Sequence, residues 1–300
     1  MTPKATHLVP RAARVAVWRA IRYARALVQH LRLKRSIWDA DATFSAATPA
    51  NQTAVDIFKG TWTSAFPPEY GVTAGAVPHF EDGRVRWAAE TLPNGFRGLS
   101  ILELGPYEGY AAAQFERLGA SSVTAVEASD LNYLKSLLVK EITGTRVRLL
   151  FGDFDRYLDS CPERFDLVWA SGVLYHSSDP LRLIGRIARV TDAVFIHTHY
   201  YLEASAALGA HRWSFFEPWR DRIERVGARP VRLHYRAYGQ TRRHDFAGGS
   251  ADYAYWLERD DLFAALHDAG FQEIRVGVDD PGNPNGAALY CLAWRAGAPR

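Results

Sequence analysis

The segment Glu103-Leu104-Gly105-Pro106-Tyr107-Glu108-Gly109 places an acid and two glycines directly after a short apolar run. Glycine lets the backbone approach a ligand closely and adopt dihedral angles that are barred to other residues. Open α/β sheets bind ligands at such turns, where a strand ends. The Gly-x-x-x-Gly spacing lacks the three glycines of a dinucleotide fingerprint, which disfavours NAD. We therefore predict a cofactor site that includes Glu103, Gly105, Tyr107 and Gly109.

Three later apolar runs also end in residues that suit an adenosyl group. Glu127 follows the second run, some twenty residues beyond the glycine turn, where a carboxylate can accept both ribose hydroxyls. After the third run, Asp153 can accept from an adenine amino group while Phe154 packs against the ring. Ser171 and Gly172 follow the fourth run and leave room for a sulfonium and its methyl group. Glu103 could instead cap a helix, and Glu127 or Asp153 could be a solvated strand-end acid, so the prediction rests on all four ends together.

Two histidines follow strands at the same expected edge, His176 after the fourth run and His199 after the fifth. A histidine of ordinary pKa accepts protons near neutral pH, so both are candidate catalytic bases. The alternative for each is a hydrogen-bonded structural histidine. His197 and His199 share one face of a strand, which makes a metal pair conceivable. No third ligand has a diagnostic spacing, so no metal is expected.

From residue 99 onward, short apolar runs alternate with stretches of helical periodicity. The runs are Ser100–Leu104, Ser122–Val126, Val147–Phe151, Phe165–Ala170 and Ala193–Thr198, and the helical stretches are Gly109–Leu118, Asp130–Ile142 and Leu181–Val190. A helix at Asp260–Ala269 and strands at Gln272–Val278 and Ala287–Trp294 follow. This alternation is typical of an α/β fold, a parallel sheet with helices on both faces.

Composition divides the chain into five parts. They are a basic amphipathic helix in 1–36, a helical and loop-rich extension in 37–98, a cofactor-binding core in 99–201, a cap or substrate insertion in 202–255, and a completion of the core sheet in 256–300. A helix over Glu81–Leu92 leads into the core.

The cap is rich in aromatics and arginines. These residues suit either a lid over a ring-bearing or anionic acceptor, or a small aromatic core. These residues are Tyr200, Tyr201, Trp213, Arg232, His234, Tyr235, Tyr238, Tyr253, Tyr255 and Trp256.

Charge is concentrated at the N-terminus, where residues 1–36 hold nine Lys or Arg and no acid. The rest of the chain has 27 basic against 33 acidic residues, a net charge of −6. An amphipathic basic helix can lie on an anionic membrane, track nucleic-acid phosphate, or dock on the body with its arginines solvated. The two cysteines, Cys161 and Cys291, form no disulfide framework, so a cytoplasmic protein is expected, and this helix offers a peripheral membrane attachment as the alternative.

These strand-end residues resemble those of the class I S-adenosylmethionine-dependent methyltransferases, over residues 99–200 and more loosely 255–295. The resemblance implies a Rossmann-like, seven-stranded, mostly parallel sheet whose last strand, Ala287–Trp294, is antiparallel. It implies S-adenosylmethionine as cofactor, with Glu103 facing the methionine amino group, Glu127 the ribose and Asp153 the adenine. Pro106-Tyr107-Glu108 stands where these enzymes often have a third glycine.

A narrower resemblance concerns Ser171-Gly172-Val173-Leu174-Tyr175-His176 with Asp179-Pro180-Leu181, which looks like the segment after the fourth strand of the tRNA wobble-uridine carboxymethyltransferases. In that group a tyrosine, a lysine and an arginine hold the extra carboxylate of carboxy-S-adenosylmethionine. Tyr175 matches the tyrosine, and Lys59 is a candidate lysine. Asn285-Gly286-Ala287 stands where the arginine is expected, which favours ordinary S-adenosylmethionine.

The sequence thus predicts a methyltransferase that acts on a small or medium-sized acceptor through O-, N- or C-methylation. A tRNA-modifying methyl- or carboxymethyltransferase is the first alternative. A non-catalytic module that binds a partner or a membrane is the second. The acceptor and the oligomeric state are not indicated by the residues.

Overall fold

The computed structural model of the protein describes residues 44–203, 216–238 and 249–297. The chain divides into two compact units, Met1–Thr48 and Pro49–Arg300, and the elements below belong to the second. The basic helix predicted in residues 1–36 and the cap residue Trp213 lie outside the described residues. No helix in the described part of the chain is both long and apolar enough to cross a bilayer.

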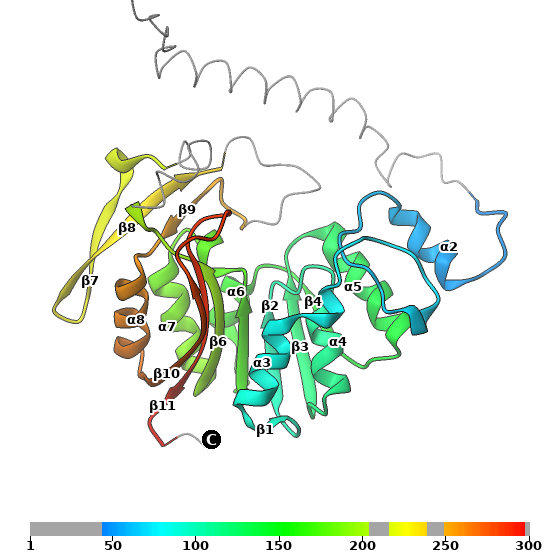
Figure 1. The fold of residues 1–300 in the computed structure, drawn as a ribbon, viewed down its shortest axis with the longest axis horizontal. Helices are drawn as coiled ribbons and strands as arrows, with labels where there is room; N and C mark the ends of the chain where they lie inside the picture. Colours follow the sequence, from blue (N-terminus) through cyan, green and yellow to red (C-terminus); the bar gives the residue numbers. More distant parts are fainter. Residues whose placement is uncertain (1–43, 204–215, 239–248, 298–300) are drawn as a thin grey trace, which may run out of the picture. The chain divides into compact units, whose positions relative to one another are not determined.

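A seven-stranded sheet forms the centre of this unit, in the order β10-β11-β6-β5-β2-β3-β4 (Figure 1). Its strands are β2 (Ser100–Leu104), β3 (Ser122–Glu127), β4 (Arg148–Phe151), β5 (Leu167–Ser171), β6 (Ala193–His199), β10 (Phe271–Asp280) and β11 (Ala288–Arg295). The five strands from β2 to β6 are mutually parallel. Strand β11 lies between β6 and β10 and is antiparallel to both, so the predicted fold class and the antiparallel last strand are confirmed.

Helices cover both faces of this sheet (Figure 1). One layer holds α3 (Gly83–Thr91), α4 (Tyr110–Arg117) and α5 (Asp130–Thr143), and the other holds α6 (Phe154–Ser160), α7 (Pro180–Val190) and α8 (Arg259–Asp268). Successive residues of a strand point to opposite faces. Ile101 of β2 therefore packs in the core with α3 and α4, and Leu102 in the core with α7 and α8. Burial on both faces explains why these strands are nearly continuous apolar runs.

The region predicted as an irregular cap contains a second, three-stranded antiparallel sheet. It consists of β7 (Arg222–Val226), β8 (Arg229–Ala237) and β9 (Tyr253–Trp256). Val231, Leu233 and Tyr235 of β8 are buried and alternate with exposed or polar positions, which is the period of a strand. This strand was not predicted, although Arg232 and His234 between the three buried positions complete a period of two. Helix α6 was also not predicted, because its seven residues are too few to show a clear helical period.

Short elements precede the central sheet. They are α2 (Asn51–Val55), the 3-10 turns η1 (Asp56–Phe58), η2 (Pro68–Tyr70) and η3 (His79–Glu81), and the short strand β1 (Pro93–Phe96) that follows α3. Phe66 and Phe80 of this region pack with Val139 of α5 in a small apolar cluster of their own. The part of the extension before the sheet is therefore built onto the α4–α5 side of the fold.

Candidate functional site

The ends of neighbouring parallel strands bring the predicted site residues to one edge of the central sheet. Glu103 lies near the end of β2, Glu127 ends β3 and Ser171 ends β5. Asp153 follows β4 after a single glycine. His199 ends β6, two residues beyond the register partner of Ser171. The sequence-predicted residues thus meet at the carboxyl edge, where open α/β sheets bind ligands.

The loop after β2 requires its glycines. Gly105 has φ +64°, and a Cβ there would lie 2.9 Å from Cγ1 of Val173. Gly109 caps α4 with φ +80°, and a Cβ would lie 3.1 Å from the Ser136 side chain. Tyr107 between them also has a left-handed backbone, with φ +59°, which is uncommon for a residue with a side chain. Its carbonyl accepts a hydrogen bond from the Ser136 hydroxyl at 3.2 Å.

The buried carboxylate of Glu127 organises this loop. One oxygen accepts from the Tyr107 amide at 3.1 Å, and the other accepts from the Ser129 amide at 2.8 Å. Burial raises the pKa of Glu127 to about 7, although these amides favour the ionised form. A carboxylate fixed in this way keeps further lone pairs for ligand hydroxyls, because each oxygen can accept more than one hydrogen bond.

Glu103 carries a buried acceptor for which the described residues supply no donor. Its side chain is 4% exposed, and Oε2 has no hydrogen-bond partner in the described part of the chain. Burial raises the pKa of Glu103 to about 8. An unsatisfied buried polar atom destabilises the folded protein, and such atoms are rare outside functional sites. A cationic ligand group at Oε2 would satisfy it and would favour the ionised carboxylate.

Asp153 combines the predicted site position with a structural role. It is the N-cap of α6, where its Oδ1 accepts from the Asp155 amide at 2.8 Å. Its Oδ2 accepts from the Ser250 hydroxyl at 3.3 Å. Phe154 is partly buried and packs against the core beneath β4 and α6. The ordinary alternative for Asp153 was a solvated strand-end acid, and the structure instead shows it as a helix cap.

The segment after β5 turns sharply into the 3-10 turn η4 (Leu174–His176). Gly172 has φ +82°, and a Cβ there would lie 3.7 Å from the Tyr175 hydroxyl. The Tyr175 carbonyl accepts from Nε1 of Trp256 at 2.9 Å and from the Tyr238 hydroxyl at 3.1 Å. Tyr175 is thus fixed between the strand end and the three-stranded sheet.

The hydrogen bonds of His176 define which of its nitrogens is protonated. The Tyr175 carbonyl can only accept, so the hydroxyl of Tyr238 donates to it and accepts from Nδ1–H of His176 at 2.6 Å. Nε2 then carries the lone pair. Burial, with the charge of Arg236 nearby, lowers the pKa of His176 to about 3. The expectation of an ordinary pKa is therefore wrong for His176: the ring is neutral at pH 7 but is a weak base.

His199 is held by a carbonyl and an aromatic ring. Its Nδ1 donates to the carbonyl of Gly286 at 2.8 Å, which leaves the lone pair on Nε2. Its ring stacks on Trp256 with 5.4 Å between centroids. Within the described residues no group of three or more potential ligands could hold a metal ion.

An ion pair at the start of α3 was not foreseen from the sequence. Arg84 forms a fork with the carboxylate of Asp82, and the two side chains are 22% and 9% exposed. Its Nη1 reaches two neighbouring strand ends, the Ser171 hydroxyl at 3.1 Å and Nδ1 of His197 at 2.7 Å. A guanidinium can only donate, so His197 accepts through Nδ1 and carries its proton on Nε2. Burial, together with the Arg84 charge, lowers the pKa of His197 to about 3.

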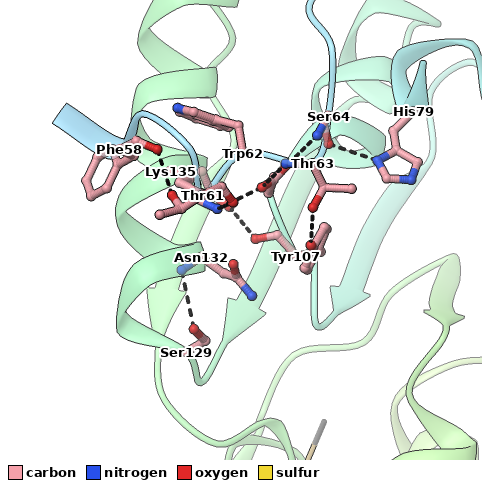
Figure 2. A network of polar contacts seen from close by, with 12 residues as sticks. Phe58, Thr61, Trp62, Thr63, Ser64, His79, Tyr107, Ser129, Asn132 and Lys135 are labelled. Atoms are coloured by element: carbon pink, nitrogen blue, oxygen red, sulfur yellow. Dashed lines mark hydrogen bonds and ion pairs between the residues drawn. The ribbon is translucent and has the colours of Figure 1, made fainter. Parts of the chain in front are cut away.

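A second unforeseen pair lies beside the glycine loop (Figure 2). Glu108 and Lys135 form a buried salt bridge of 2.8 Å that also binds residues 61–64. One signal was visible in the sequence, because Lys135 falls on the same face of its helix as Leu131 and Val139. A lysine on an apolar helix face is buried only when it is paired.

Of the residues expected to hold an extra cofactor carboxylate, Tyr175 lies in η4, which follows β5, whereas the lysine and arginine positions do not support such a site. Lys59 is exposed and caps η1. At Gly286, with φ +109°, a Cβ would lie 3.2 Å from the ring of Trp256. The space that an arginine side chain would need is therefore occupied by the indole ring and by His199, whose Nδ1 would lie 3.8 Å away.

Most of the cap aromatics form a core rather than an open lid. Tyr200, Tyr235, Tyr238, Tyr255 and Trp256 are all less than 9% exposed. A small cavity between this cluster and the sheet edge is lined in part by Tyr175 and His199. The expectation of a small aromatic core beneath the cap is confirmed for these five residues.

Comparisons with known proteins agree with this geometry. A family model described as a methyltransferase domain matches residues 80–275. The crystal structure of the N-terminal domain of EvdMO1 with SAH bound is 25% identical, with a TM-score of 0.61, and the match covers 81% of this chain and 95% of that one. The same domain in the presence of SAH and D-fucose is 26% identical, with a TM-score of 0.60 and coverage of 82% and 95%. The chain spans 46% of a longer EvdMO1 structure, at 22% identity and a TM-score of 0.54. No curated protein sequence gave a significant match.

Proposed function

Because the chain belongs to the methyltransferase domain family, we propose that it transfers a methyl group from S-adenosylmethionine to an oxygen, nitrogen or carbon atom of a small or medium-sized acceptor. The observation that carries this proposal is the unsatisfied buried Oε2 of Glu103 at the carboxyl edge of the sheet. An aminoacyl ammonium group is a donor of the right charge for that atom. The N-terminal domain of EvdMO1, which was crystallised with SAH bound, supports the choice of cofactor.

In this proposal, each of three acids binds a different group of the cofactor. Glu103 accepts from the methionine ammonium group, Glu127 accepts from the ribose hydroxyls, and Asp153 accepts from the adenine amino group beside Phe154. Gly105, Tyr107 and Gly109 form the loop that allows the backbone to approach the cofactor, since two of these positions hold glycines with positive φ. The sulfonium supplies an activated methyl group, so this chain has to bind, orient and exclude water.

The methyl acceptor is proposed to approach over Ser171, Gly172 and Tyr175. His176 and His199 follow the strand ends at this edge, and the hydrogen bond of each ring at Nδ1 makes Nε2 its basic nitrogen, so each is a candidate base for the acceptor's proton. Because the pKa of His176 is lowered to about 3, it suits an acceptor that loses its proton late, after the methyl group has been transferred. Two structures of the EvdMO1 domain, one of them in the presence of D-fucose, make hydroxylated small molecules the first acceptors to test.

A second candidate is a tRNA-modifying methyl- or carboxymethyltransferase. It is supported by the position of Tyr175, which is half-buried beside Gly172. The exposed Lys59 and the indole ring packed against Gly286 speak for ordinary S-adenosylmethionine as the cofactor. Steep salt-dependent binding of tRNA would support the alternative, and the absence of tRNA binding at low salt would contradict it.

Calorimetry with the pure protein tests the leading proposal. We expect S-adenosylmethionine and S-adenosylhomocysteine (SAH) to bind, and carboxy-S-adenosylmethionine to bind at least tenfold more weakly. If neither of the first two binds, the proposal fails. Methyl transfer to any acceptor would also rule out a purely non-catalytic module.

A further inference from the structure

The salt bridge between Glu108 and Lys135 is almost fully buried, with side chains 0% and 2% exposed and 2.8 Å between Nζ and Oε1. Removing two charges from water is unfavourable unless further hydrogen bonds satisfy them. Here the backbone of one short segment, Thr61–Ser64, supplies those bonds. Lys135 donates to the Thr61 carbonyl at 2.6 Å. The amides of Thr63 and Ser64 donate to Glu108 at 3.0 and 2.7 Å (Figure 2).

The segment Thr61–Ser64 is also held from its outer side. The amides of Ala76 and Val77 donate to the Thr63 carbonyl at 3.1 and 2.9 Å. The Gly75 amide donates to the Ser64 carbonyl at 2.9 Å. A Cβ at Gly75 would lie only 2.2 Å from the carbonyl of Thr63, so this close approach requires glycine. The segment is therefore enclosed between Glu108 on one side and residues 75–77 on the other.

The same contacts reach the cofactor loop. The Thr63 hydroxyl lies 2.7 Å from the Tyr107 hydroxyl, and Tyr107 precedes Glu108 in the chain. The amide of Tyr107 donates to Glu127, the acid proposed to hold the ribose. One loop thus has its side chains tied to Thr61–Ser64 and its backbone tied to the cofactor acid. Movement of the segment changes the conformation available to the loop.

The segment lies before the residues that the family model matches. The family model begins at residue 80, whereas the contacts to Glu108 and Tyr107 come from residues 61–64. Glu108 and Tyr107 also occupy the loop positions that depart from the glycine-rich pattern of the resemblance. The loop positions that depart from the pattern are therefore the ones that contact the segment Thr61–Ser64.

We propose that Glu108 and Lys135 are positioning residues that couple the segment Thr61–Ser64 to cofactor binding. The ion pair holds the segment against the loop, and a bound cofactor, by fixing Tyr107 through Glu127, holds the segment in return. Such coupling is reciprocal. A change that loosens the segment lowers the affinity for the cofactor, and binding of the cofactor stabilises the segment by the same factor. The inference rests on the proposed function, since it concerns the same cofactor site.

Amide hydrogen exchange of the full chain with and without saturating SAH is the first test. We expect SAH to slow exchange of the Thr63 and Ser64 amides at least fivefold, as those two amides donate to Glu108. A merely structural ion pair would leave their exchange unchanged by SAH. The exposed amide region around η2 (Pro68–Tyr70) serves as an internal reference that SAH should not affect.

Calorimetry of variants is the second test. Lys135→Met should weaken SAH binding tenfold or more. Thr63→Val, which keeps the ion pair and removes only the hydroxyl next to Tyr107, should weaken it about fivefold, the loss of one hydrogen bond. Arg148→Met is the matched control, because Arg148 forms an exposed salt bridge with Glu163 far from the loop and should leave affinity unchanged.

The outcomes separate this inference from the proposed function. If the wild type binds no SAH, the proposed function fails and the coupling fails with it. If the wild type binds SAH but exchange at Thr63 and Ser64 does not change, the coupling is overturned and the proposed function stands. Wild-type affinity in Thr63→Val also overturns it, and this variant decides the matter if Lys135→Met does not fold.

Discussion

The backbone amide of Tyr107 donates to the carboxylate of Glu127 across 3.1 Å, so the acid that ends β3 holds the loop that follows β2. Tyr107 keeps a left-handed backbone although it is not glycine. That conformation is unfavourable for a side-chain-bearing residue and persists where surrounding contacts enforce it. Glu127, Ser136 and Thr63 supply those contacts through the amide, carbonyl and hydroxyl of Tyr107. Glu127 therefore has two roles: it fixes the conformation of the loop, and it is proposed to bind the ribose.

Replacing Glu127 tests both roles. Glu127→Ala removes the acceptor of the Tyr107 and Ser129 amides and should weaken SAH binding at least tenfold in calorimetry. Glu127→Gln retains one carbonyl oxygen and should show a smaller loss, because it can still accept from one amide. Affinity equal to the wild type in Glu127→Ala would remove the ribose assignment.

Replacing Glu103 should separate stability from binding. Because burial raises the pKa of Glu103 to about 8 from 4.5, the folded protein holds a proton between these values that the unfolded chain has lost. The free energy of unfolding should then fall as pH rises from about 4.5 to 8. Glu103→Gln removes this dependence, so urea denaturation at pH 8.5 should find the variant more stable than the wild type.

The same substitution should weaken SAH binding tenfold or more, since a neutral amide replaces the carboxylate that faces the ammonium group. Binding to the wild type at pH 7 should release a proton from Glu103, which makes the calorimetric enthalpy differ between Tris and phosphate buffers. An equal enthalpy in both buffers would contradict ionisation of Glu103 on binding.

Arg84→Met should destabilise the protein by about 3 kcal/mol or more, because it leaves the carboxylate of Asp82 buried without its partner. Although burial opposes ionisation, hydrogen bonding to Arg84 holds the pKa of Asp82 below its usual range. Arg86→Met, in an exposed position of the same helix, is the control and should change stability by less than about 0.5 kcal/mol. Equal urea midpoints for the two variants would show that the Arg84–Asp82 ion pair does not stabilise the folded protein.

His176 should stay neutral throughout the physiological pH range. Burial lowers its pKa to about 3, so its imidazole signals in NMR should not titrate between pH 5 and 8. Since the unfolded histidine has a pKa of 6.5, the unfolded chain binds more protons between pH 3 and 6.5, and stability should rise with pH in that window. A titration midpoint near 6.5 would contradict the lowered pKa and would agree with the ordinary pKa that the sequence predicts for His176.

Gly75→Ala should destabilise the protein by about 1–3 kcal/mol, because the new methyl group would overlap the Thr63 carbonyl and force the backbone apart. The control is Gly185→Ala in α7, where no atom lies within 4 Å of the added Cβ. There the better helix propensity of alanine should increase stability by up to about 1 kcal/mol. Thermal or urea unfolding measures both, and two changes of the same sign would contradict the packing at Gly75.

The central sheet was predictable because its strands are buried on both faces and their sequences are short apolar runs. β2 was predicted at its observed bounds, and the other core strands within a few residues. The three-stranded sheet was missed although Val231, Leu233 and Tyr235 alternate with polar residues, because the aromatics and arginines of this region were assigned to a cap. Strand-end acids were predictable for a related reason: once the strands are parallel, their carboxyl ends meet at one edge.

The ion pairs were not predictable from local pattern. Arg84 follows an N-cap aspartate and looks like a solvated residue of an amphipathic helix, yet its guanidinium contacts His197, 113 residues away. In the sequence, Glu108 only interrupts a glycine-rich loop, whereas in the structure it accepts from the Thr63 amide and pairs with Lys135. Contacts over such separations depend on the packing of whole elements.

The enclosure of Thr61–Ser64 has a consequence for biosynthesis. This segment leaves the ribosome first, but Glu108 follows 45 residues after Thr63, and Lys135 follows 74 residues after Thr61. Until α5 has been translated and packed on α4, the carbonyl of Thr61 and the aromatic ring of Trp62, over which Lys135 lies at 5.3 Å, lack their final partner. Thr61–Ser64 is therefore translated early, but it cannot be enclosed before α5 has left the ribosome.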